Sequence, residues 1–459
     1  MPDFVYGDLQ VTFLNTKYAQ MAKMWDTRTP RESKFKHVLQ HIPVKNTPSI
    51  SILKKNIFRI FVRKNITYMK HELKENAGLP VYMLWTFAIV AGVSVANLYY
   101  NQPLLNLIRQ DLQVSEFQTN LIAMITQVGY ALGLLFIVPL GDLYRRKRIV
   151  LFNFLLLVVS LLSMAEATHI YQVWAASLVT GICSMIPQIF VPIASQFSRP
   201  EHKGRNVGIV ISGLLTGILA SRVVSGWVGD VFGWRAMYYA ASAFMIVCAC
   251  VVWAVLPDIP PTFQGKYRKL MGSLWPIVRD YPPLRIYALR SGLAFGSFLA
   301  MWSCLSFKMS GAPFFAGSDV VGYLGLCGIA GALTASFVGQ AVKRVGVRRF
   351  NYLGCALFLL AWTSLSLGGE SYVGIVAGVL LIDIGMQCIQ LSNQTSILEL
   401  CPSASNRMNT LFMTTYFAGG SLGTLLAGLC WDAAGWTGVT LAGIALTLAS
   451  ISLTAGSRY

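Results

Sequence analysis

From residue 80 onward, long hydrophobic stretches alternate with short polar segments. Each stretch carries hardly any charge and is about as long as a bilayer is thick, because ~20 residues rising about 1.5 Å each cross the hydrocarbon layer. Backbone groups in lipid must bond within their own segment, so these stretches are predicted to be helices. The pattern predicts an all-α membrane protein with twelve spans, at 81–102, 118–140, 149–167, 171–196, 207–229, 236–256, 286–308, 319–341, 350–368, 372–397, 408–430 and 437–456.

Composition and charge support this class. Hydrophobic residues make up 55% of the chain and charged residues only 12%. Lys and Arg gather in the loops on one side of the predicted spans, as at 144–148 and 341–349, and few occur on the other side. Cytoplasmic loops carry such an excess, so both termini are predicted to be cytoplasmic. This bias and a basic N-terminal tail explain the net charge of +18 without a nucleic-acid partner.

The chain is predicted to divide into four parts. Residues 1–79 form a basic cytoplasmic tail, which is either an amphipathic helix on the membrane surface or loosely ordered. The Pro-containing segment 258–285 is a cytoplasmic linker between two six-helix bundles, at 80–257 and 286–459. The nine cysteines have no metal-ligand spacing, and we interpret them as packing residues rather than as a metal site or a disulfide framework.

The two predicted bundles repeat each other at an offset of about 202 residues. The matching residues are Gly226, Asp230 and Trp234 with Gly428, Asp432 and Trp436, Gln188 with Gln390, and Arg205 with Arg407. Internal repeats are typical of transporters that hold their substrate between two bundles near the middle of the membrane. The repeat therefore favours a pseudo-symmetric transporter.

The loop after the second span, 140–148, resembles the signature of the major facilitator superfamily, roughly G-x-L-a-D-R-x-G-R-K/R. The matching residues are Leu140, Asp142, Arg146 and Lys147. The strings 96–105, 213–222 and 409–420 are similar to the sugar and drug efflux branch, which includes arabinose- and purine-nucleoside-efflux-like proteins. The chain departs from the proton antiporters of the family at Leu178, where an Arg is usual, and at Leu214, where a Pro is usual.

The resemblance implies a gate at the cytoplasmic end. Asp142 would face the start of the eleventh span, where a carboxylate complements the partial positive charge of a helix N-terminus. Arg146 would brace the same seam. In the second half the corresponding gate residues are Gly339, Arg344, Gly346 and Arg348, with Lys343 in place of the acid. The alternative is that the loop 142–148 supplies only the positive charge that sets topology.

Asp383 lies near the middle of the tenth span. A charge at that depth costs at least ~2.5 kcal/mol, so it normally faces a cavity or a partner and marks a pathway. Gln387 and Gln390 follow on the same helical face. Removal from water disfavours a charged carboxylate, which suits a proton carrier. The alternative is a hydrogen-bonded structural Asp between packed helices.

Other polar residues within spans are candidates for the same pathway. Arg222 could pair with Asp383, bind an anionic or polyol substrate, or extend to the membrane surface, as we also expect of Arg290. Tyr100 belongs either to a site or to the interfacial aromatic belt. The remaining candidates are amides: Asn97, Gln127 and Gln188.

Together these features predict a secondary transporter that moves a sugar, nucleoside or drug-like solute by alternating access. Proton-coupled efflux is the first hypothesis; an uptake symporter, a passive facilitator and a non-transporting sensor are the alternatives. The sequence lacks a nucleotide-binding loop and a hydrolase motif, so no enzyme activity is predicted. We expect a monomer in the lipid bilayer, with a proton gradient and no cofactor. The plasma membrane is the expected location, with an organelle or bacterial inner membrane as alternatives.

Overall fold

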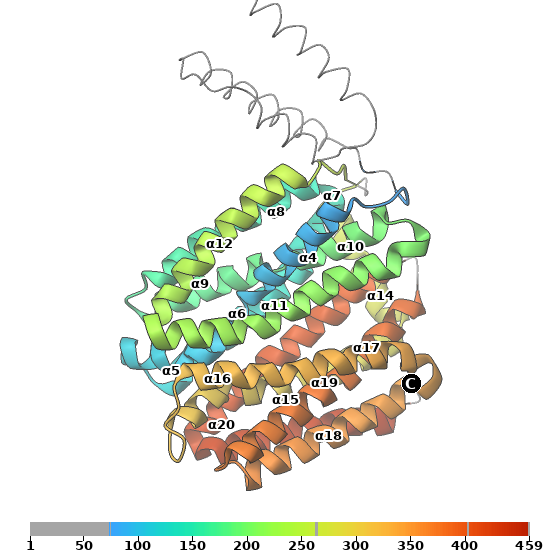
Figure 1. Cartoon of the computed structure of the whole chain (residues 1–459). Helices are drawn as coiled ribbons and strands as arrows, with labels where there is room; N and C mark the ends of the chain where they lie inside the picture. Colours follow the sequence, from blue (N-terminus) through green and yellow to red (C-terminus); the bar gives the residue numbers. More distant parts are fainter. Residues whose placement is uncertain (1–72, 74, 262–264, 402–403, 458–459) are drawn as a thin grey trace, which may run out of the picture. The chain divides into compact units, whose positions relative to one another are not determined.

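A computed structural model describes residues 73, 75–261, 265–401 and 404–457. Among these residues the chain is helical and contains no strand (Figure 1). The predicted amphipathic segment of the tail falls outside the described residues, so both interpretations of the tail stay open.

The first six predicted spans correspond to helices of the first bundle. They are α4 (Val81–Ala96) with α5 (Asn101–Leu112), α6 (Glu116–Leu132) with the π-helix η1 (Gly133–Ile137) and α7 (Leu140–Leu143), α8 (Arg146–Ala165), α9 (Ile170–Cys183) with α10 (Pro187–Phe197), α11 (Lys203–Phe232), which follows the short η2 (Pro200–His202), and α12 (Trp234–Val255). The first span runs further than predicted, to Leu112, because polar residues that end the hydrophobic stretch, such as Asn101 and Gln102, are buried inside the protein.

Two short helices, α13 (Tyr267–Gly272) and α14 (Leu274–Asp280), precede the second bundle. That bundle consists of α15 (Pro282–Ser310), α16 (Ser318–Leu324) with η3 (Gly325–Cys327) and α17 (Gly328–Val345), α18 (Val347–Leu367), α19 (Tyr372–Leu400) and α20 (Ser405–Gly456). The backbone of α20 is non-helical at Ala434 and Gly435, where the chain bends. This bend separates the eleventh and twelfth predicted spans, so the described residues confirm the twelve-span arrangement.

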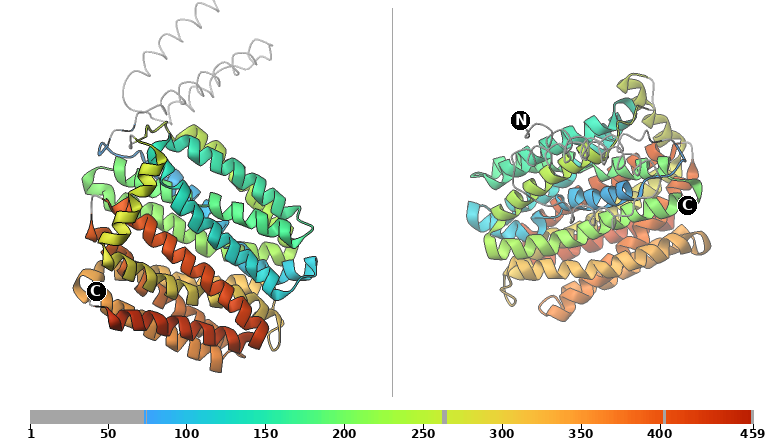
Figure 2. Two further views of the ribbon diagram at one scale, coloured as in Figure 1. Left: turned by 180° about the vertical axis from the view of Figure 1, so that it is seen from behind. Right: turned by 45° about the horizontal axis from the view of Figure 1, so that its top comes forward.

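Glycines allow the helices within each bundle to pack closely. A Cβ on Gly217 of α11 would lie 2.2 Å from the carbonyl oxygen of Gly92 in α4. A Cβ on Gly423 of α20 would lie 2.1 Å from the carbonyl oxygen of Gly296 in α15. Figures 1 and 2 show α4, in blue, beside the green α11. Because lipid tails are as apolar as the side chains, helix association in a membrane depends on such close backbone contact.

The two bundles meet along a seam formed mainly by α6 against α20 and α11 against α16. The second span begins at Glu116 and ends at Leu143, and we name the two ends of the membrane region the Glu116 end and the Asp142 end. Asn120 Nδ2 donates to the Thr424 carbonyl at 2.8 Å, and Ser318 Oγ donates to the Gly226 carbonyl at 2.9 Å. Both bonds cross the seam at the Glu116 end and hold it closed.

The expectation that Arg290 extends to the membrane surface is wrong. Its side chain is 0% exposed. Its Nη2 donates to the Leu453 carbonyl at 3.3 Å and also bonds the Ser457 hydroxyl, both at the end of α20. A cation is stabilised at the C-terminus of a helix, where the last carbonyls carry partial negative charge. Arg290 is in the first helix of the second bundle and its partners are at the end of the last one. The pattern of hydrophobic residues along the chain cannot predict this contact.

Candidate functional site

Asp383 and Arg222 both lie at the seam between the bundles. Asp383 of α19 is 6% exposed and Arg222 of α11 is 2% exposed. A Cβ on Gly328 would lie 3.7 Å from Asp383 Oδ1, and a Cβ on Gly325 would lie 2.9 Å from the Cβ of Arg222. The two side chains therefore approach the same point, where the short η3 helix interrupts the eighth span. The fold thus brings together the two strongest charged candidates of the sequence.

Aromatic rings and an amide hold the guanidinium of Arg222. Its Nε donates to Gln102 Oε1 at 2.9 Å. Its Cζ lies 4.0 Å from the ring centroid of Trp302 and 5.2 Å from that of Tyr99. Cation–π contacts of this kind are strong where water is excluded. Arg222 therefore does not extend to the membrane surface, which was one of its three interpretations.

The carboxylate of Asp383 is left without a donor on one side. Its Oδ2 is buried and has no hydrogen-bond partner. Among the described residues no ion pair within 4.0 Å joins Asp383 to Arg222. A buried carboxylate without partners is costly in its charged form. The position can therefore accept a proton.

Two tyrosines beside this seam are held by glutamines that correspond to each other in the repeat. Gln188 Nε2 donates to the Tyr130 hydroxyl at 3.3 Å, and the Tyr416 hydroxyl donates to Gln390 Oε1 at 3.0 Å. Thus two of the predicted amides orient aromatic side chains at the seam.

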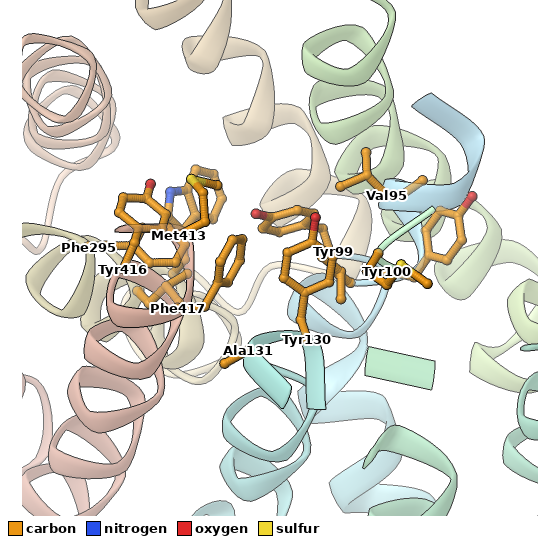
Figure 3. Close-up of a cluster of buried hydrophobic side chains, with 14 of the residues drawn as sticks. Val95, Tyr99, Tyr100, Tyr130, Ala131, Phe295, Met413, Tyr416 and Phe417 are labelled. Carbon is orange, nitrogen blue, oxygen red and sulfur yellow. The ribbon is translucent and has the colours of Figure 1, made fainter. Parts of the chain in front are cut away.

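The rings themselves form a cluster between the bundles, which Figure 3 shows. The centroids of Tyr130 and Phe417 are 4.4 Å apart, and those of Phe295 and Tyr416 are 3.9 Å apart. Tyr130 comes from the first bundle and the other three rings from the second. This cluster is not apparent from the sequence, because aromatic residues are common throughout the spans and no spacing distinguishes these four.

Among the described residues, none of the other pathway candidates has a hydrogen bond to Asp383 or Arg222. Asn97 Nδ2 donates to the Ser94 carbonyl at 3.0 Å, and Asn97 also contacts Met245, so it bonds within the first bundle. Tyr100 is 5% exposed, which excludes a lipid-facing place in the aromatic belt. Gln127 is buried with no hydrogen-bond partner for its Oε1, and Gln387 is half-buried.

The gate residues of the first half make contacts within their own bundle. Arg146 is 5% exposed; its Nε donates to the Gly141 carbonyl at 3.2 Å and its Nη1 to Gln196 Oε1 at 2.9 Å. Its Nη2 lies 3.7 Å from Asp142 Oδ1. Arg146 thus links α7 to α10. The predicted contact of Asp142 with the start of the eleventh span stays a prediction.

The repeat-related gate residues surround the junction of α17 and α18. Gly346 has φ +91°, a conformation that favours glycine, and it lets the chain turn between these helices. Arg348 Nη2 donates to the Ala455 carbonyl of α20 at 3.3 Å. Arg344 is exposed, and a Cβ on Gly339 would meet no atom within 4 Å. Their gating role is likewise a prediction.

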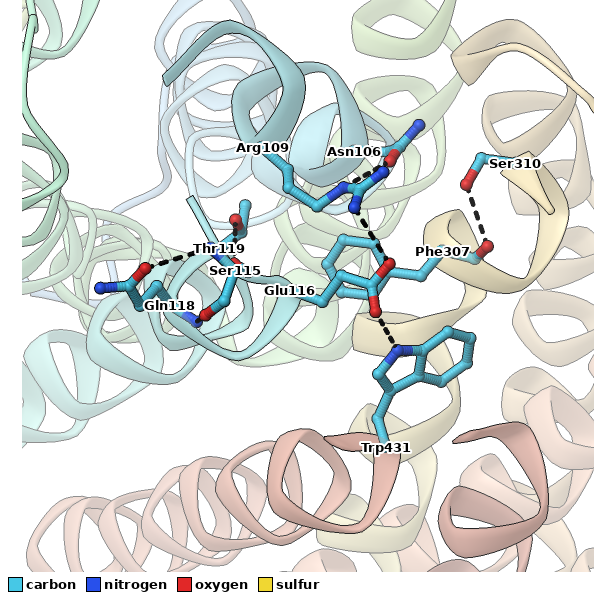
Figure 4. A network of polar contacts seen from close by, with 9 residues as sticks. All are labelled: Asn106, Arg109, Ser115, Glu116, Gln118, Thr119, Phe307, Ser310 and Trp431. Atoms are coloured by element: carbon cyan, nitrogen blue, oxygen red, sulfur yellow. Dashed lines mark hydrogen bonds and ion pairs between the residues drawn. The ribbon is translucent and has the colours of Figure 1, made fainter. Parts of the chain in front are cut away.

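A charged network that the sequence did not suggest closes the Glu116 end (Figure 4). Glu116 Oε2 accepts a hydrogen bond from Trp431 Nε1 of α20, and Glu116 Oε1 lies 3.3 Å from Arg109 Nη1. Arg109 Nε donates in turn to Asn106 Oδ1 at 3.1 Å. Charge-assisted bonds are stronger than neutral ones. Glu116 therefore links the first bundle to the second at this end.

Replacement of Glu116 by Ala is expected to favour opening of the Glu116 end. The change removes the acceptor of Trp431, and a charge-assisted bond of ~1.5–3 kcal/mol corresponds to a shift of about tenfold or more in the equilibrium. The measurement is the rate at which a maleimide reacts with the Ser306→Cys variant, whose changed position is buried in this seam, in a background that lacks the nine natural cysteines. Glu166→Ala is the control, because Glu166 bonds Tyr239 within the first bundle. Equal rates in both variants would contradict the role of Glu116.

The chain is similar in sequence to known membrane transporters. A sequence profile of the Major Facilitator Superfamily matches residues 87–424. The uncharacterized transporter YgaY of Escherichia coli O157:H7 is 34% identical over 378 residues, which are 82% of this chain and 96% of the relative. The inner membrane transport protein YnfM of Escherichia coli K12 is 28% identical over 388 residues, which are 83% of this chain and 91% of the relative.

The fold is also similar to a solved structure, a bacterial homolog of the human lysosomal transporter Spinster in an inward-facing, unoccupied conformation. The TM-score is 0.66 at 12% identity, over 82% of this chain and 95% of that one. Members of the matched family are transporters rather than enzymes, and they bind small-molecule substrates within the membrane. The profile match, the relatives and the two bundles of apolar helices show that the chain belongs to the Major Facilitator Superfamily and is a multi-pass membrane transporter.

Proposed function

We propose that this transporter exports a small organic solute in exchange for protons, and that Asp383 carries the proton. The observation that supports this most is the buried Oδ2 of Asp383, which has no partner and lies at the seam near Arg222. Sequence similarity to efflux proteins supports the outward direction. The basic loops support a cytoplasmic position for the Asp142 end, in a plasma membrane, with the chain acting as a monomer.

In the proposed exchange, Asp383 alternates between a protonated, neutral form and a charged carboxylate. A proton that enters from the Glu116 end binds Oδ2 and makes the side chain neutral. Loss of that proton toward the Asp142 end restores the carboxylate, which then attracts the guanidinium of Arg222. Because Arg222 belongs to the first bundle and Asp383 to the second, protonation changes the force between the bundles. Alternating access is movement of the bundles about such a site.

The side chains around this seam suit a solute with a flat or apolar face. Rings from both bundles meet there, and buried aromatic side chains favour stacking with other rings. Arg222, Gln188 and Gln390 supply hydrogen-bonding groups beside the rings. Nucleosides and drug-like compounds combine these features better than sugars do, and we propose them as the solute class.

The test is reconstitution of the full chain in proteoliposomes that contain a trapped pH dye. Nucleosides, lipophilic cations and sugars are added one at a time under an imposed proton gradient. Proton movement that depends on a solute from the first two groups would support the proposal. Solute movement without proton movement would indicate a passive facilitator. Absence of flux with every solute would favour the sensor hypothesis and count against transport of these classes.

A further inference from the structure

A cavity lies at the Glu116 end, and its lining includes none of the rings of the aromatic cluster. Its volume is about 350 Å³. It lies between the bundles, because α5 and α11 supply one wall and α15, α16 and the loop before α16 supply the other. The residues that line it include Asn106, Gln110, Asp230, Ser306 and Phe315. Pockets of this size at domain interfaces are typical of small-molecule sites.

Two carboxylates from different bundles approach each other beside this cavity. Asp230 belongs to α11 and Asp319 to α16. A Cβ on Gly317 would lie 2.5 Å from Asp230 Oδ1 and 2.8 Å from Asp319 Oδ1. Both carboxylate oxygens therefore lie close to the same point, where their like charges repel across the closed seam. The start of α16 lies next to them, but a helix N-terminus carries only about half a positive charge.

The cationic side chains of this end are engaged elsewhere. Arg109 pairs with Glu116, Arg235 pairs with Asp111, and Lys308 lies over the ring of Phe314. Among the described residues no ion pair within 4.0 Å involves Asp230 or Asp319. Asp230 is the one charged residue in the cavity lining and Asp319 lies beside it, so the cavity carries net negative charge, which a cation from solution can neutralise.

The cavity also presents contacts for the rest of an organic cation. Ser306 lines it, is 2% exposed and has a buried hydroxyl without a hydrogen-bond partner. Phe315, which is 77% exposed, offers an aromatic ring to the same space. Aromatic faces and a carboxylate together recognise quaternary ammonium groups. No group of three potential metal ligands occurs among the described residues, so a bare metal ion is a poorer match.

We propose that this cavity binds a small organic ammonium ion, which bridges Asp230 and Asp319 and stabilises the closed Glu116 end. The ammonium group lies between the two carboxylates, its alkyl groups contact Phe315, and a hydroxyl group on the ligand bonds Ser306. The cavity lining does not include Asp383, the proposed proton carrier. Its occupancy would favour the conformation in which the bundles are joined at the Glu116 end.

The test is equilibrium binding of radiolabelled choline to the full chain in nanodiscs at low salt. The proposal expects saturable binding that 3,3-dimethyl-1-butanol, the uncharged isostere of choline, does not displace. Asp230→Asn, Asp319→Asn and Phe315→Ala are each expected to weaken binding by about tenfold or more, because each removes a direct contact with the ammonium group. Asp432→Asn is the matched control, since Asp432 is the repeat counterpart of Asp230, is exposed and lies outside the cavity lining.

Several results would overturn the proposal. The first is the absence of saturable choline binding to the wild type, and the second is equal choline affinity in Asp230→Asn and wild type. The third is displacement of choline by NaCl that is as effective as displacement by unlabelled choline, because this result would indicate a site for an inorganic cation. Asp383→Asn is expected to keep choline binding. Loss of proton coupling in that variant with retained choline binding would separate this site from the proposed transport path.

Discussion

Asp383→Asn is expected to reduce solute-dependent proton movement in proteoliposomes to the level of protein-free vesicles. The amide is nearly isosteric with the acid but cannot take up and release a proton, so the variant keeps the shape of the site and loses the carrier. The buried Oδ2 of Asp383 has no donor to lose, and folding should be preserved. The measurement is the trapped-dye signal with wild type and variant at equal reconstituted amounts.

Asp432→Asn is the control for this experiment, because Asp432 is an exposed acid of the same bundle. It should leave proton movement unchanged. Solute exchange across vesicles, measured without a proton gradient, separates the two roles of Asp383. If exchange continues while net proton movement stops, Asp383 is a coupling residue. If proton movement and solute flux are both unchanged in Asp383→Asn, the assignment of the proton to Asp383 is wrong.

Gly217→Leu is expected to destabilise the first bundle by about 3 kcal/mol or more, because overpacking already costs ~1–3 kcal/mol where side chains can adjust. Here the new Cβ would lie 2.2 Å from the Gly92 carbonyl oxygen, and backbone cannot move aside without separating α4 from α11. Since stabilities of 5–15 kcal/mol are typical, this loss should lower the Tm clearly. The measurement is thermal unfolding of the purified protein, together with the yield of monodisperse protein.

Gly208→Leu is the matched control on the same helix. A Cβ at Gly208 would meet no atom within 4 Å, so the larger side chain has room. Both substitutions remove a helical glycine and add the same side chain, so the backbone entropy gained is the same. Equal Tm values in the two variants would refute close packing of α4 and α11 as the cause.

The fold class could be predicted from the chain because the bilayer imposes a length and a composition on each span. The twelve stretches, the repeat and the signature around Asp142 all follow from the order of residues, and the helices and the family match confirm the class. The ends of helices could not be predicted where tertiary contacts bury polar residues, because a polar residue then no longer marks the end of the span. The extension of the first span through Asn101 to Leu112 is such a case.

Part of the candidate site could be predicted from the sequence, and the rest required the tertiary structure. Asp383 was identifiable from sequence because a charge in the middle of an apolar stretch needs a physical reason. Its approach to Arg222 beside η3 required the fold, since the two residues belong to different bundles. The seam contact of Glu116 with Trp431 and the cavity at Asp230 required it too, because these residues resemble ordinary loop and interface residues in sequence.

The order of hydrophobic and polar residues shows how many segments are long enough to cross a membrane and which residues are too polar for lipid. It could not determine the partners of those residues, because hydrophobicity is a property of each segment and pairing is a property of two segments in space. Arg290 shows the difference most clearly. Its position in a span indicated a side chain that must escape from lipid, and only the tertiary structure showed that the end of α20 supplies its carbonyl partner.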